Sequence, residues 1–297
     1  MTAKKKKIIV FAVAAAVLLA LIIWTAWGNT ALEFNTYTIS SDRLPEAFDG
    51  YRIAHVSDLH NTEMGKGNEK LLNMLRDAEP DMIAITGDLI DSRSTDIEIA
   101  LNFINAAMEI APCYYVPGNH EARLSKSEYE KLENGLLDAG VIVLHDSEII
   151  LENNGDEISL IGIDDPNWYN ASTNLTDGGE YESKVGSTMD PERIRELSTT
   201  DSFTVLLSHR PEYFEQYAEA DVDLVFSGHA HGGQFRLPFV GGLVAPNQGL
   251  FPKYDAGLYT EDNTNMIVSR DIGNSILPFR FNNRPEVILI ELESEVS

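Results

Sequence analysis

The sequence predicts an α/β domain with enough strands for two sheets, preceded by one N-terminal transmembrane helix. From Tyr51 onward, short β-branched runs alternate with helix-like segments, which is typical of right-handed βαβ units around a largely buried sheet. From Val141 onward, further short strands follow, with little helix between the first of them. The chain has 297 residues, 43% of them hydrophobic, so it can bury a sizeable core.

The N-terminal part of the chain predicts a membrane anchor. Residues 1–7 form a basic tail with four lysines, and residues 8–28 form an apolar run whose only polar side chain is Thr25. At about 1.5 Å per residue, this run is long enough to cross a bilayer. Trp24 and Trp27 lie at its far end, where aromatic side chains anchor a helix at the membrane surface.

The lysines of the tail are expected to stay in the cytoplasm, because positive charge beside a membrane span is retained on that side. Residues 29–50 would then be a linker, and residues 51–297 a domain held outside the cell membrane by a single pass. A cleaved signal peptide is the alternative. Its apolar region is normally shorter and is followed by a small-x-small cleavage site, and no clear site of that kind follows the run here.

The first half of the domain alternates strand and helix. Runs rich in β-branched and aromatic residues are expected to be strands, and segments with apolar residues three and four apart are expected to be helices. The expected strands are 51–57, 81–87 and 113–116, and the expected helices are 69–78 and 97–110.

The second half begins with strands and returns to an α/β pattern. Its polar, Gly-rich segment 165–190 is expected to be a long loop. The expected strands are 141–144, 148–151, 158–163, 203–207, 224–226, 265–269 and 286–292, and the expected helices are 191–197 and 211–218.

Charge and cysteine content exclude two classes of protein. The chain has 22 Lys and Arg against 47 Asp and Glu, a net charge of −25, so it repels polyanions and no nucleic-acid partner is expected. A small anionic substrate remains compatible, since metal ions dominate the field close to them. The single cysteine, Cys113, cannot form an internal disulfide, so the chain is not a disulfide scaffold.

Ligand-type side chains follow the predicted strands. The run 224–234 ends on His229 and His231, and in an extended chain residues i and i+2 point the same way, so both imidazoles are expected to face one spot. Ligands of open α/β sheets gather beyond the carboxyl ends of strands. The polar residues that follow the other predicted strands are Asp58, His60, Asp88, Asn119, His120 and His209.

These side chains predict a metal centre. Five of the seven histidines in the chain are among them. Imidazole nitrogens combined with Asp and Asn oxygens suit Mn²⁺, Fe²⁺ or Zn²⁺. Seven donor groups are too many for one ion, whereas two ions about 3.5–4 Å apart need roughly that number, including one bridging carboxylate.

The strand-end motifs resemble those of the calcineurin-like metallophosphoesterases, from about Tyr51 to the C-terminus. Five blocks in order are specific, although each alone is weak. Segments 248–254 and 274–278 resemble the bacterial membrane-anchored subgroup of that family. The five blocks are Asp58-Leu-His60, Gly87-Asp88, Gly118-Asn-His-Glu121, His209 and Gly228-His-Ala-His231.

The resemblance implies a four-layer αββα sandwich with two mixed sheets and a dinuclear metal site at the C-terminal ends of strands. It also implies a role for each ligand. Asp58, His60 and His231 would hold one ion, Asn119, His209 and His229 the other, and Asp88 would bridge the two.

The same resemblance implies a hydrolytic reaction. A hydroxide bridging the two ions would attack phosphorus in line with the leaving oxygen. His120 would protonate the leaving group or stabilise charge on the phosphoryl group, and Asp58 would orient it. Four further residues are candidates for contacts with the substrate, and the alternative for each is a structural role. They are Arg123, Arg210, Lys253 and Tyr254.

The leading hypothesis is a membrane-anchored phosphoric ester hydrolase that acts on phosphodiesters or pyrophosphates. Because the domain is tethered to the membrane, lipids or polymers of the cell envelope are the suggested substrates. A phosphomonoesterase or a nucleotide phosphodiesterase is the alternative within the same fold. A metal-loaded binding protein without turnover is the alternative in another class. Activity ratios on monoesters and diesters separate the first two, and metal-dependent turnover separates both from the third.

Overall fold

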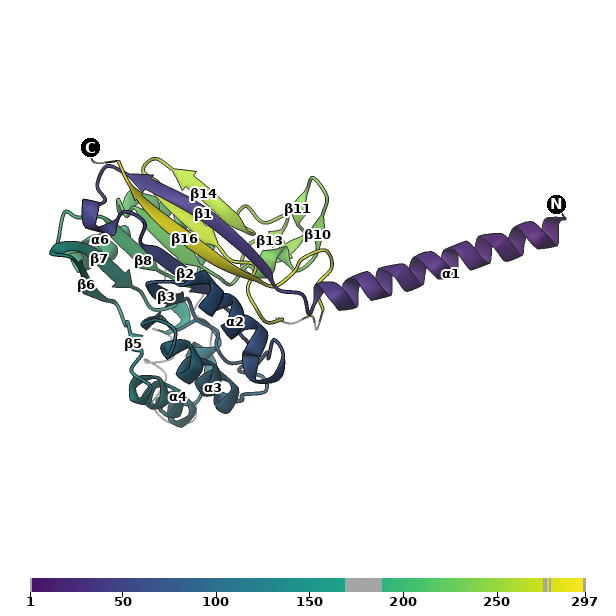
Figure 1. The fold of residues 1–297 in the computed structure, drawn as a ribbon, viewed down its shortest axis with the longest axis horizontal. Coiled ribbons are helices and arrows are strands. Elements are labelled where there is room, and N and C mark those ends of the chain that lie inside the picture. The colour runs from purple at the N-terminus through teal and green to yellow at the C-terminus, as the bar shows by residue number, and fades with distance from the viewer. Residues whose placement is uncertain (1, 169–188, 275–276, 278, 296–297) are drawn as a thin grey trace.

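The computed structural model describes residues 2–168, 189–274, 277 and 279–295 (Figure 1). The long loop expected over 165–190 lies mainly outside the described residues. Two six-stranded sheets form the centre of the domain, and five α-helices flank them within the described part of the chain. The N-terminal helix projects away from the domain (Figure 1).

The first sheet is mixed and has the strand order β1-β16-β2-β3-β4-β5. β16 runs parallel to β1 and antiparallel to β2, and the remaining pairs are parallel. Its strands are β1 (Glu33–Ser41), β16 (Glu286–Ser294), β2 (Arg52–Val56), β3 (Met82–Ile85), β4 (Cys113–Tyr115) and β5 (Ile142–Val143).

The second sheet is also mixed and has the order β14-β15-β9-β8-β7-β6. Its outermost pairs, β14 with β15 and β6 with β7, are antiparallel, and the inner pairs are parallel. Its strands are β14 (Gly257–Glu261), β15 (Thr264–Val268), β9 (Leu224–Ser227), β8 (Thr204–Leu207), β7 (Asp156–Gly162) and β6 (Ser147–Asn153).

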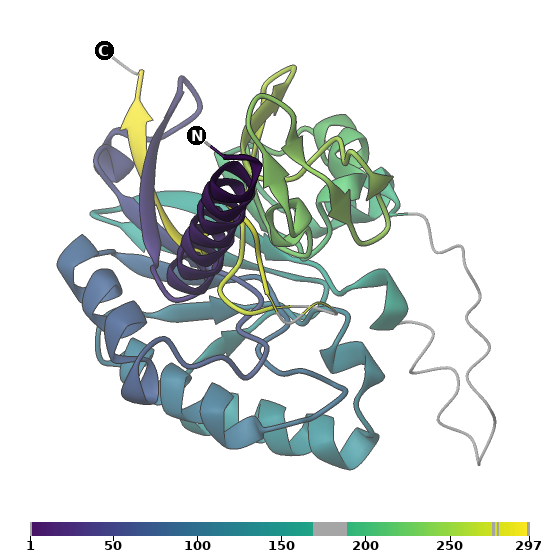
Figure 2. The same ribbon diagram turned by 90° about the vertical axis from the view of Figure 1, so that its right-hand side faces the viewer.

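Helices cover the outer face of each sheet. Figures 1 and 2 show α2, α3 and α4 on one side of the molecule, below the first sheet. Short 3₁₀ turns lead into several elements. The helices are α2 (Glu69–Ala78), α3 (Ile97–Met108) and α4 (Lys126–Asp138) on the first sheet, and α6 (Pro191–Leu197) and α7 (Phe214–Glu219) on the second.

Alternation along the buried strands produces the four layers. In β3, Ile83 and Ile85 pack against α2 and α3, while Met82 and Ala84 face the other sheet. In β8 the same alternation directs Leu206 outward, to the helices of the second sheet. Because successive side chains of a strand point to opposite faces, each sheet buries both faces. The predicted αββα sandwich with two mixed sheets is confirmed.

The N-terminal border of the domain differs from the prediction. The expected linker over 29–50 contains β1, which pairs with β16 along its whole length, and a 3₁₀ turn, η1 (Glu46–Phe48). Leu44 and Phe48 are fully buried in the core between the sheets. β1 gives a weak signal because it is an edge strand whose residues are mostly half exposed. The domain therefore begins near residue 33.

Helix α4 was not predicted, although its start has a sequence signature. The Ser125 hydroxyl accepts a hydrogen bond from the Glu128 backbone N–H, and the Glu128 carboxylate accepts one from the backbone N–H of Ser125. This is a capping box, and Ser-x-x-Glu before an apolar pattern marks it. Leu132 and Leu136 then bury one face of the helix against α3 and the first sheet.

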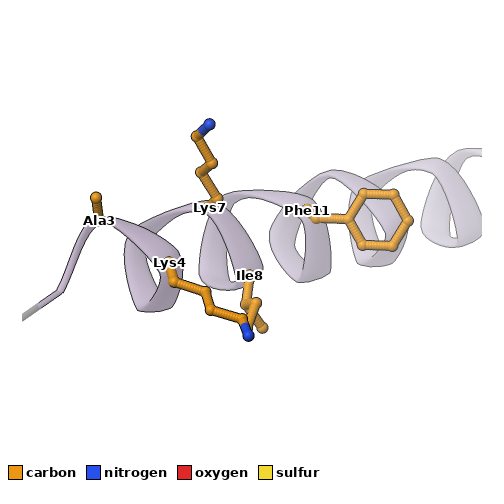
Figure 3. A pocket seen from close by; sticks show the side chains of 5 residues that line it. All are labelled: Ala3, Lys4, Lys7, Ile8 and Phe11. Carbon is orange, nitrogen blue, oxygen red and sulfur yellow. The ribbon is translucent and has the colours of Figure 1, made fainter.

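Helix α1 (Ala3–Gly28) has the length and composition of a membrane-spanning segment, with a mean hydropathy of 2.9 over its most apolar window and no burial there. Figure 3 shows the beginning of the helix, where Lys4 and Lys7 flank the first apolar side chains. Ile8 and Phe11 are 58% and 77% exposed. An apolar helix whose most apolar stretch is left uncovered by the described part of its own domain is suited to a lipid environment.

The end of α1 is fastened to the domain. The Asn29 side-chain amide donates to the carbonyl of Arg280 at 2.8 Å, and the Arg280 backbone N–H donates back to Asn29 Oδ1 at 2.7 Å. The Arg284 guanidinium lies 5.0 Å from the ring centre of Trp27. These contacts fix the point at which the helix leaves the domain.

Asp223, at the start of β9, provides a test of stability against pH. Its buried carboxylate accepts the Thr204 backbone N–H at 2.8 Å, and burial raises its pKa to about 6. Because that pKa lies above the value of about 4 in an unfolded chain, folding binds a proton between pH 4 and 6, and stability falls as the pH rises through this window. Asp223→Asn keeps the hydrogen-bond acceptor but has no carboxyl group to titrate. Its free energy of unfolding should therefore gain on that of wild type between pH 4 and 7, by roughly 2 kcal/mol, and its melting temperature should rise accordingly.

The control for this substitution is Asp262→Asn, an exposed residue in the turn between β14 and β15. Both variants would be melted in the presence of a chelator at pH 4 and at pH 7. A melting-temperature difference between wild type and Asp223→Asn that is the same at both values would contradict the assignment.

Candidate metal centre

The seven predicted ligands meet in one place, at the adjoining carboxyl ends of strands from both sheets. All are buried, with exposures of 6% or less. Asp58 and His60 follow β2, and Asp88 follows β3. The remaining ligands come after β4, β8 and β9, and they are Asn119, His209, His229 and His231.

The backbone at the centre is not extended, so one expectation is wrong. His229 and His231 have φ values of 64° and 47°, and His231 begins the 3₁₀ turn η5 (His231–Gly233). The two imidazoles therefore face adjacent groups of ligands and not a single spot. Asp58 and Asp88 are also left-handed, with φ values of 54° and 51°. Such conformations cost about 1–3 kcal/mol each and gather at functional sites.

The first group contains Asp58, His60 and His231. Asp58 Oδ1 lies 3.3 Å from His60 Nε2 and 3.5 Å from His231 Nε2. These three ligand atoms lie within 4.8 Å of one another, close enough to share one ion.

The second group contains Asn119, His209 and His229. His209 Nε2 lies 3.1 Å from His229 Nδ1 and 3.2 Å from Asn119 Oδ1. The other nitrogen of His209, Nδ1, lies 2.7 Å from the carbonyl of Thr86, so it donates its hydrogen there and leaves Nε2 with a lone pair.

Asp88 lies between the two groups. Its Oδ2 is 3.5 Å from His60 Nε2 in the first group and 3.4 Å from His209 Nε2 in the second. Its Oδ1 accepts the backbone N–H of His120 at 2.7 Å, which fixes the carboxylate in this position. The arrangement suits a carboxylate that bridges two ions.

The donor atoms of the second group fit a cation. Asn247 Oδ1, 3.0 Å from His229 Nε2, accepts the hydrogen of that ring, so His229 Nδ1 presents a lone pair to His209 Nε2. The Asn119 side-chain oxygen faces the same nitrogens. With its amide turned over, Asn119 would donate to both rings, at 3.2 and 2.7 Å. Three acceptor atoms that face one another are satisfied by a positive ion at their centre.

The charges at the centre also fit cations. Burial alone would raise the pKa of Asp88, but the nearby His209, His120 and His60 hold it well below its usual value. Burial lowers the pKa of His209, yet Asp88 and Asp58 raise it well above its usual value, so positive charge is favoured at Nε2, and a bound ion would supply that charge in place of a proton. Burial and the Arg210 charge keep the pKa of His229 low, so its ring is neutral, as a ligand must be. The pKa of Asp58 is likewise lowered, against the effect of burial, by His209, His231 and His60, so Asp58 and Asp88 both remain buried anions that require positive partners.

Two buried carboxylates hold the ligands in place and were not predicted to do so. Glu121 accepts the backbone N–H groups of Asp88 and Gly118, both at 2.8 Å, and burial together with Asp88 raises its pKa to about 7. Asp271 Oδ2 accepts the His231 backbone N–H at 2.9 Å and lies 3.3 Å from Nδ1 of that ring. Glu121 is the last residue of the motif Gly118-Asn-His-Glu121, whereas no sequence signal marks Asp271.

His120 lies beside the first group, with Nε2 4.0 Å from Asp88 Oδ2. Its Nδ1 accepts the backbone N–H of Ser92 at 3.0 Å, so the neutral ring carries its hydrogen on Nε2, facing the ligands. Burial lowers the pKa of His120 to about 4. The expectation that Asp58 orients this ring is wrong, because Ser92 does so from the loop after β3.

The four predicted substrate contacts fall into different places. Arg123 is exposed, and its Nη1 lies 3.2 Å from the outward amide atom of Asn119, so it borders the centre. Lys253 pairs with Glu215 and covers the ring of Tyr254, which is buried. Among the described residues, neither Lys253 nor Tyr254 makes a hydrogen bond or ion pair with the seven ligands.

Arg210 is buried and committed to the protein. Its guanidinium pairs with Asp165 and donates to Asn247 Oδ1 at 2.8 Å. Nη1 also lies 3.1 Å from His229 Nε2. The predicted phosphate contact is therefore replaced by a supporting role, in which Arg210 holds the two residues behind His229.

Comparison with known proteins decides the family of this chain. The family model for calcineurin-like phosphoesterases matches residues 51–233, more than half of the sequence. The chain belongs to the calcineurin-like phosphoesterases. It is accordingly a metal-dependent phosphoric ester hydrolase by family, and its clustered ligands lie at the strand ends described above.

Relatives of this phosphoesterase include bacterial and vertebrate proteins. It is 28% identical over 270 residues to the metallophosphoesterase YkoQ of Bacillus subtilis, covering 89% of this chain and 92% of the relative. It is 26% identical over 250 residues to the phosphodiesterase YaeI of Escherichia coli, covering 82% of each. A transmembrane protein with a metallophosphoesterase domain from Danio rerio is 28% identical over 86% of this chain and 56% of its own length.

The fold is also shared with solved structures. The sulfate thiohydrolase SoxB of Thermus thermophilus superposes with a TM-score of 0.50, covering 84% of this phosphoesterase and 57% of that chain. The identity of 12% limits this likeness to the fold.

Proposed function

We propose that this phosphoesterase is a membrane-anchored hydrolase with two divalent ions, Mn²⁺, Fe²⁺ or Zn²⁺, in the site described above. One ion is held by Asp58, His60 and His231, and the other by Asn119, His209 and His229. The position of Asp88, with one oxygen about equally far from His60 Nε2 and His209 Nε2, carries the proposal.

When bound, the ions supply positive charge for the phosphoryl oxygens and lower the pKa of a water molecule. The protein contributes the rest. His120 points its Nε2–H toward the place where substrate must lie, so it can donate a hydrogen bond to a phosphoryl or leaving oxygen. Arg123, exposed at the rim, offers a second donor for phosphate oxygens.

The substrate class we propose is a phosphodiester or pyrophosphate, carried by lipids or polymers of the cell envelope. The name of the relative YaeI, a phosphodiesterase, supports the diester. The exposed apolar stretch of α1 and the transmembrane relative from Danio rerio support the membrane anchor. The four lysines before α1 favour a domain on the extracytoplasmic side.

The test begins with the full chain purified in detergent. It would be stripped with a chelator, reloaded with Mn²⁺, Fe²⁺ or Zn²⁺, and assayed on bis(p-nitrophenyl) phosphate and p-nitrophenyl phosphate. We expect metal-dependent turnover with two ions per chain and faster hydrolysis of the diester. Faster hydrolysis of the monoester would make the chain a phosphomonoesterase, and two bound ions without turnover on either ester would favour a binding protein.

His120→Gln separates catalysis from metal binding. We expect kcat to fall by about 10²-fold or more, because the hydrogen bond from Nε2–H to a phosphoryl or leaving oxygen is lost, while two ions per chain remain bound. Metal content measured by mass spectrometry alongside kcat checks this. His145→Gln is the control, since His145 also pairs with a carboxylate, Asp164, but makes no hydrogen bond or ion pair with the seven ligands within the described part of the chain. A loss of metal in His120→Gln would instead make His120 a ligand.

A further inference from the structure

Two short hairpins expose a group of large apolar side chains. The first joins β10 (Arg236–Leu237) to β11 (Gly241–Gly242), and the second joins β12 (Val244–Ala245) to β13 (Gly249–Leu250). We call their exposed apolar residues the hairpin surface. They are Leu237, Phe239, Val240, Val244, Leu250 and Phe251, with exposures of 40%, 109%, 55%, 37%, 74% and 64%.

The hairpin surface lies on the side of the domain from which α1 leaves. Figure 1 shows β10, β11 and β13 beside the base of α1, and the view along the helix in Figure 2 shows the same hairpins near it. The contacts explain this position. Arg280 is bonded to Asn29 at the end of α1, and the next residue, Phe281, accepts the backbone N–H of Arg236 at 3.0 Å. One short segment thus holds both the helix end and the first hairpin.

The composition of the hairpins suits lipid. Across residues 235–252 the only charged side chain is Arg236, and it pairs with Asp255, whereas 23% of the whole chain is charged. A second copy of this chain is a less suitable partner, because two bodies of net charge −25 repel each other. Exposed aromatic and aliphatic side chains on loops next to a membrane span are able to enter the acyl boundary of the bilayer.

We infer that the hairpin surface inserts into the outer leaflet of the same bilayer that α1 crosses. The inference rests on the proposed role of α1 as a membrane anchor. The second hairpin links this contact to the metal centre, since Asn247, between β12 and β13, lies 3.0 Å from His229 Nε2. The domain is then attached to the membrane at two places, α1 and the hairpin surface. The second hairpin contacts both the lipid and a residue of the metal centre.

The test measures the depth of single labelled positions. The full chain, with Cys113→Ala so that no other thiol reacts, would carry Phe239→Cys or Phe251→Cys labelled with an environment-sensitive fluorophore. It would be placed in nanodiscs of phosphatidylcholine and phosphatidylglycerol. Leu137→Cys is the matched control, because Leu137 is a 53% exposed apolar residue on α4, which lies away from α1 (Figure 1).

We expect nitroxide-bearing lipids to quench positions 239 and 251 but not 137, and iodide in water to quench only 137. The emission of labels at positions 239 and 251 should also lie further to the blue in nanodiscs than in a buffer that contains detergent below its micelle concentration. Quenching of all three positions by iodide alone, with α1 retained in the nanodisc, would overturn the hairpin contact. A chain that does not enter nanodiscs would overturn the anchor and the contact together, whereas metal-dependent turnover would be unaffected by either result.

Discussion

Replacement of Asp88 by asparagine is expected to lower kcat/KM by about 10³-fold or more, since each ion loses an anionic ligand worth several kcal/mol in the transition state. Asp88 Oδ2 faces Nε2 of His60 in one group and Nε2 of His209 in the other, whereas Asp58 approaches His209 only at Nδ1, so Asp58 does not replace it. The amide oxygen can still accept the backbone N–H of His120, which limits damage to the fold. The metal content should fall from two ions per chain to one or fewer.

Kinetics on bis(p-nitrophenyl) phosphate and elemental analysis would be measured on the same preparations. Asp96→Asn provides the control, because Asp96 caps α3 through the Glu98 backbone N–H and asparagine caps a helix equally well. An Asp88→Asn variant that keeps both ions and wild-type turnover would remove Asp88 from the centre.

Replacement of Gly228 by alanine is the second large expected effect. A methyl group at this position would lie 1.9 Å from Ser57 Oγ and 2.3 Å from Asp58 Oδ2, closer than atoms can approach. Either the Asp58 carboxylate or the turn after β9 must move. Displacing a catalytic group by about 1 Å costs about 10²-fold in rate, and overpacking costs about 1–3 kcal/mol of stability.

The measurement is kcat with excess Mn²⁺, together with the midpoint of unfolding in urea. Gly28→Ala is the matched exchange, since an added methyl group there meets nothing within 4 Å. Wild-type kcat and stability in Gly228→Ala would mean that the two sheets do not approach each other here as closely as described.

The sequence was most informative where one short segment carries both a structure and its function. Each motif combines a buried strand with the polar residues directly after it, so the parallel sheets, the strand ends and the seven ligands could be predicted together. β1 could not be predicted, because an edge strand is half polar, and the hairpins could not, because each of their strands has two residues.

The supporting contacts of the centre depend on topology and therefore escaped prediction. Asp271 reaches His231 from 40 residues away, and Asn247 reaches His229 from the tip of a hairpin. Ser92 replaces the expected partner of His120 from a loop 28 residues earlier in the chain. In each case the contact joins segments that no local pattern connects, and only the folded sheet brings them together.

The position of β16 has a consequence for synthesis. This last strand lies between β1 and β2, the first two strands of the chain. Nascent β1 therefore has no neighbour to pair with until residues 286–294 have been made, and more than 200 residues separate the two strands. The first sheet therefore cannot be completed until synthesis has passed residue 294. Chains cut short before Glu286 are expected to be left with an open sheet edge and to be removed by proteases.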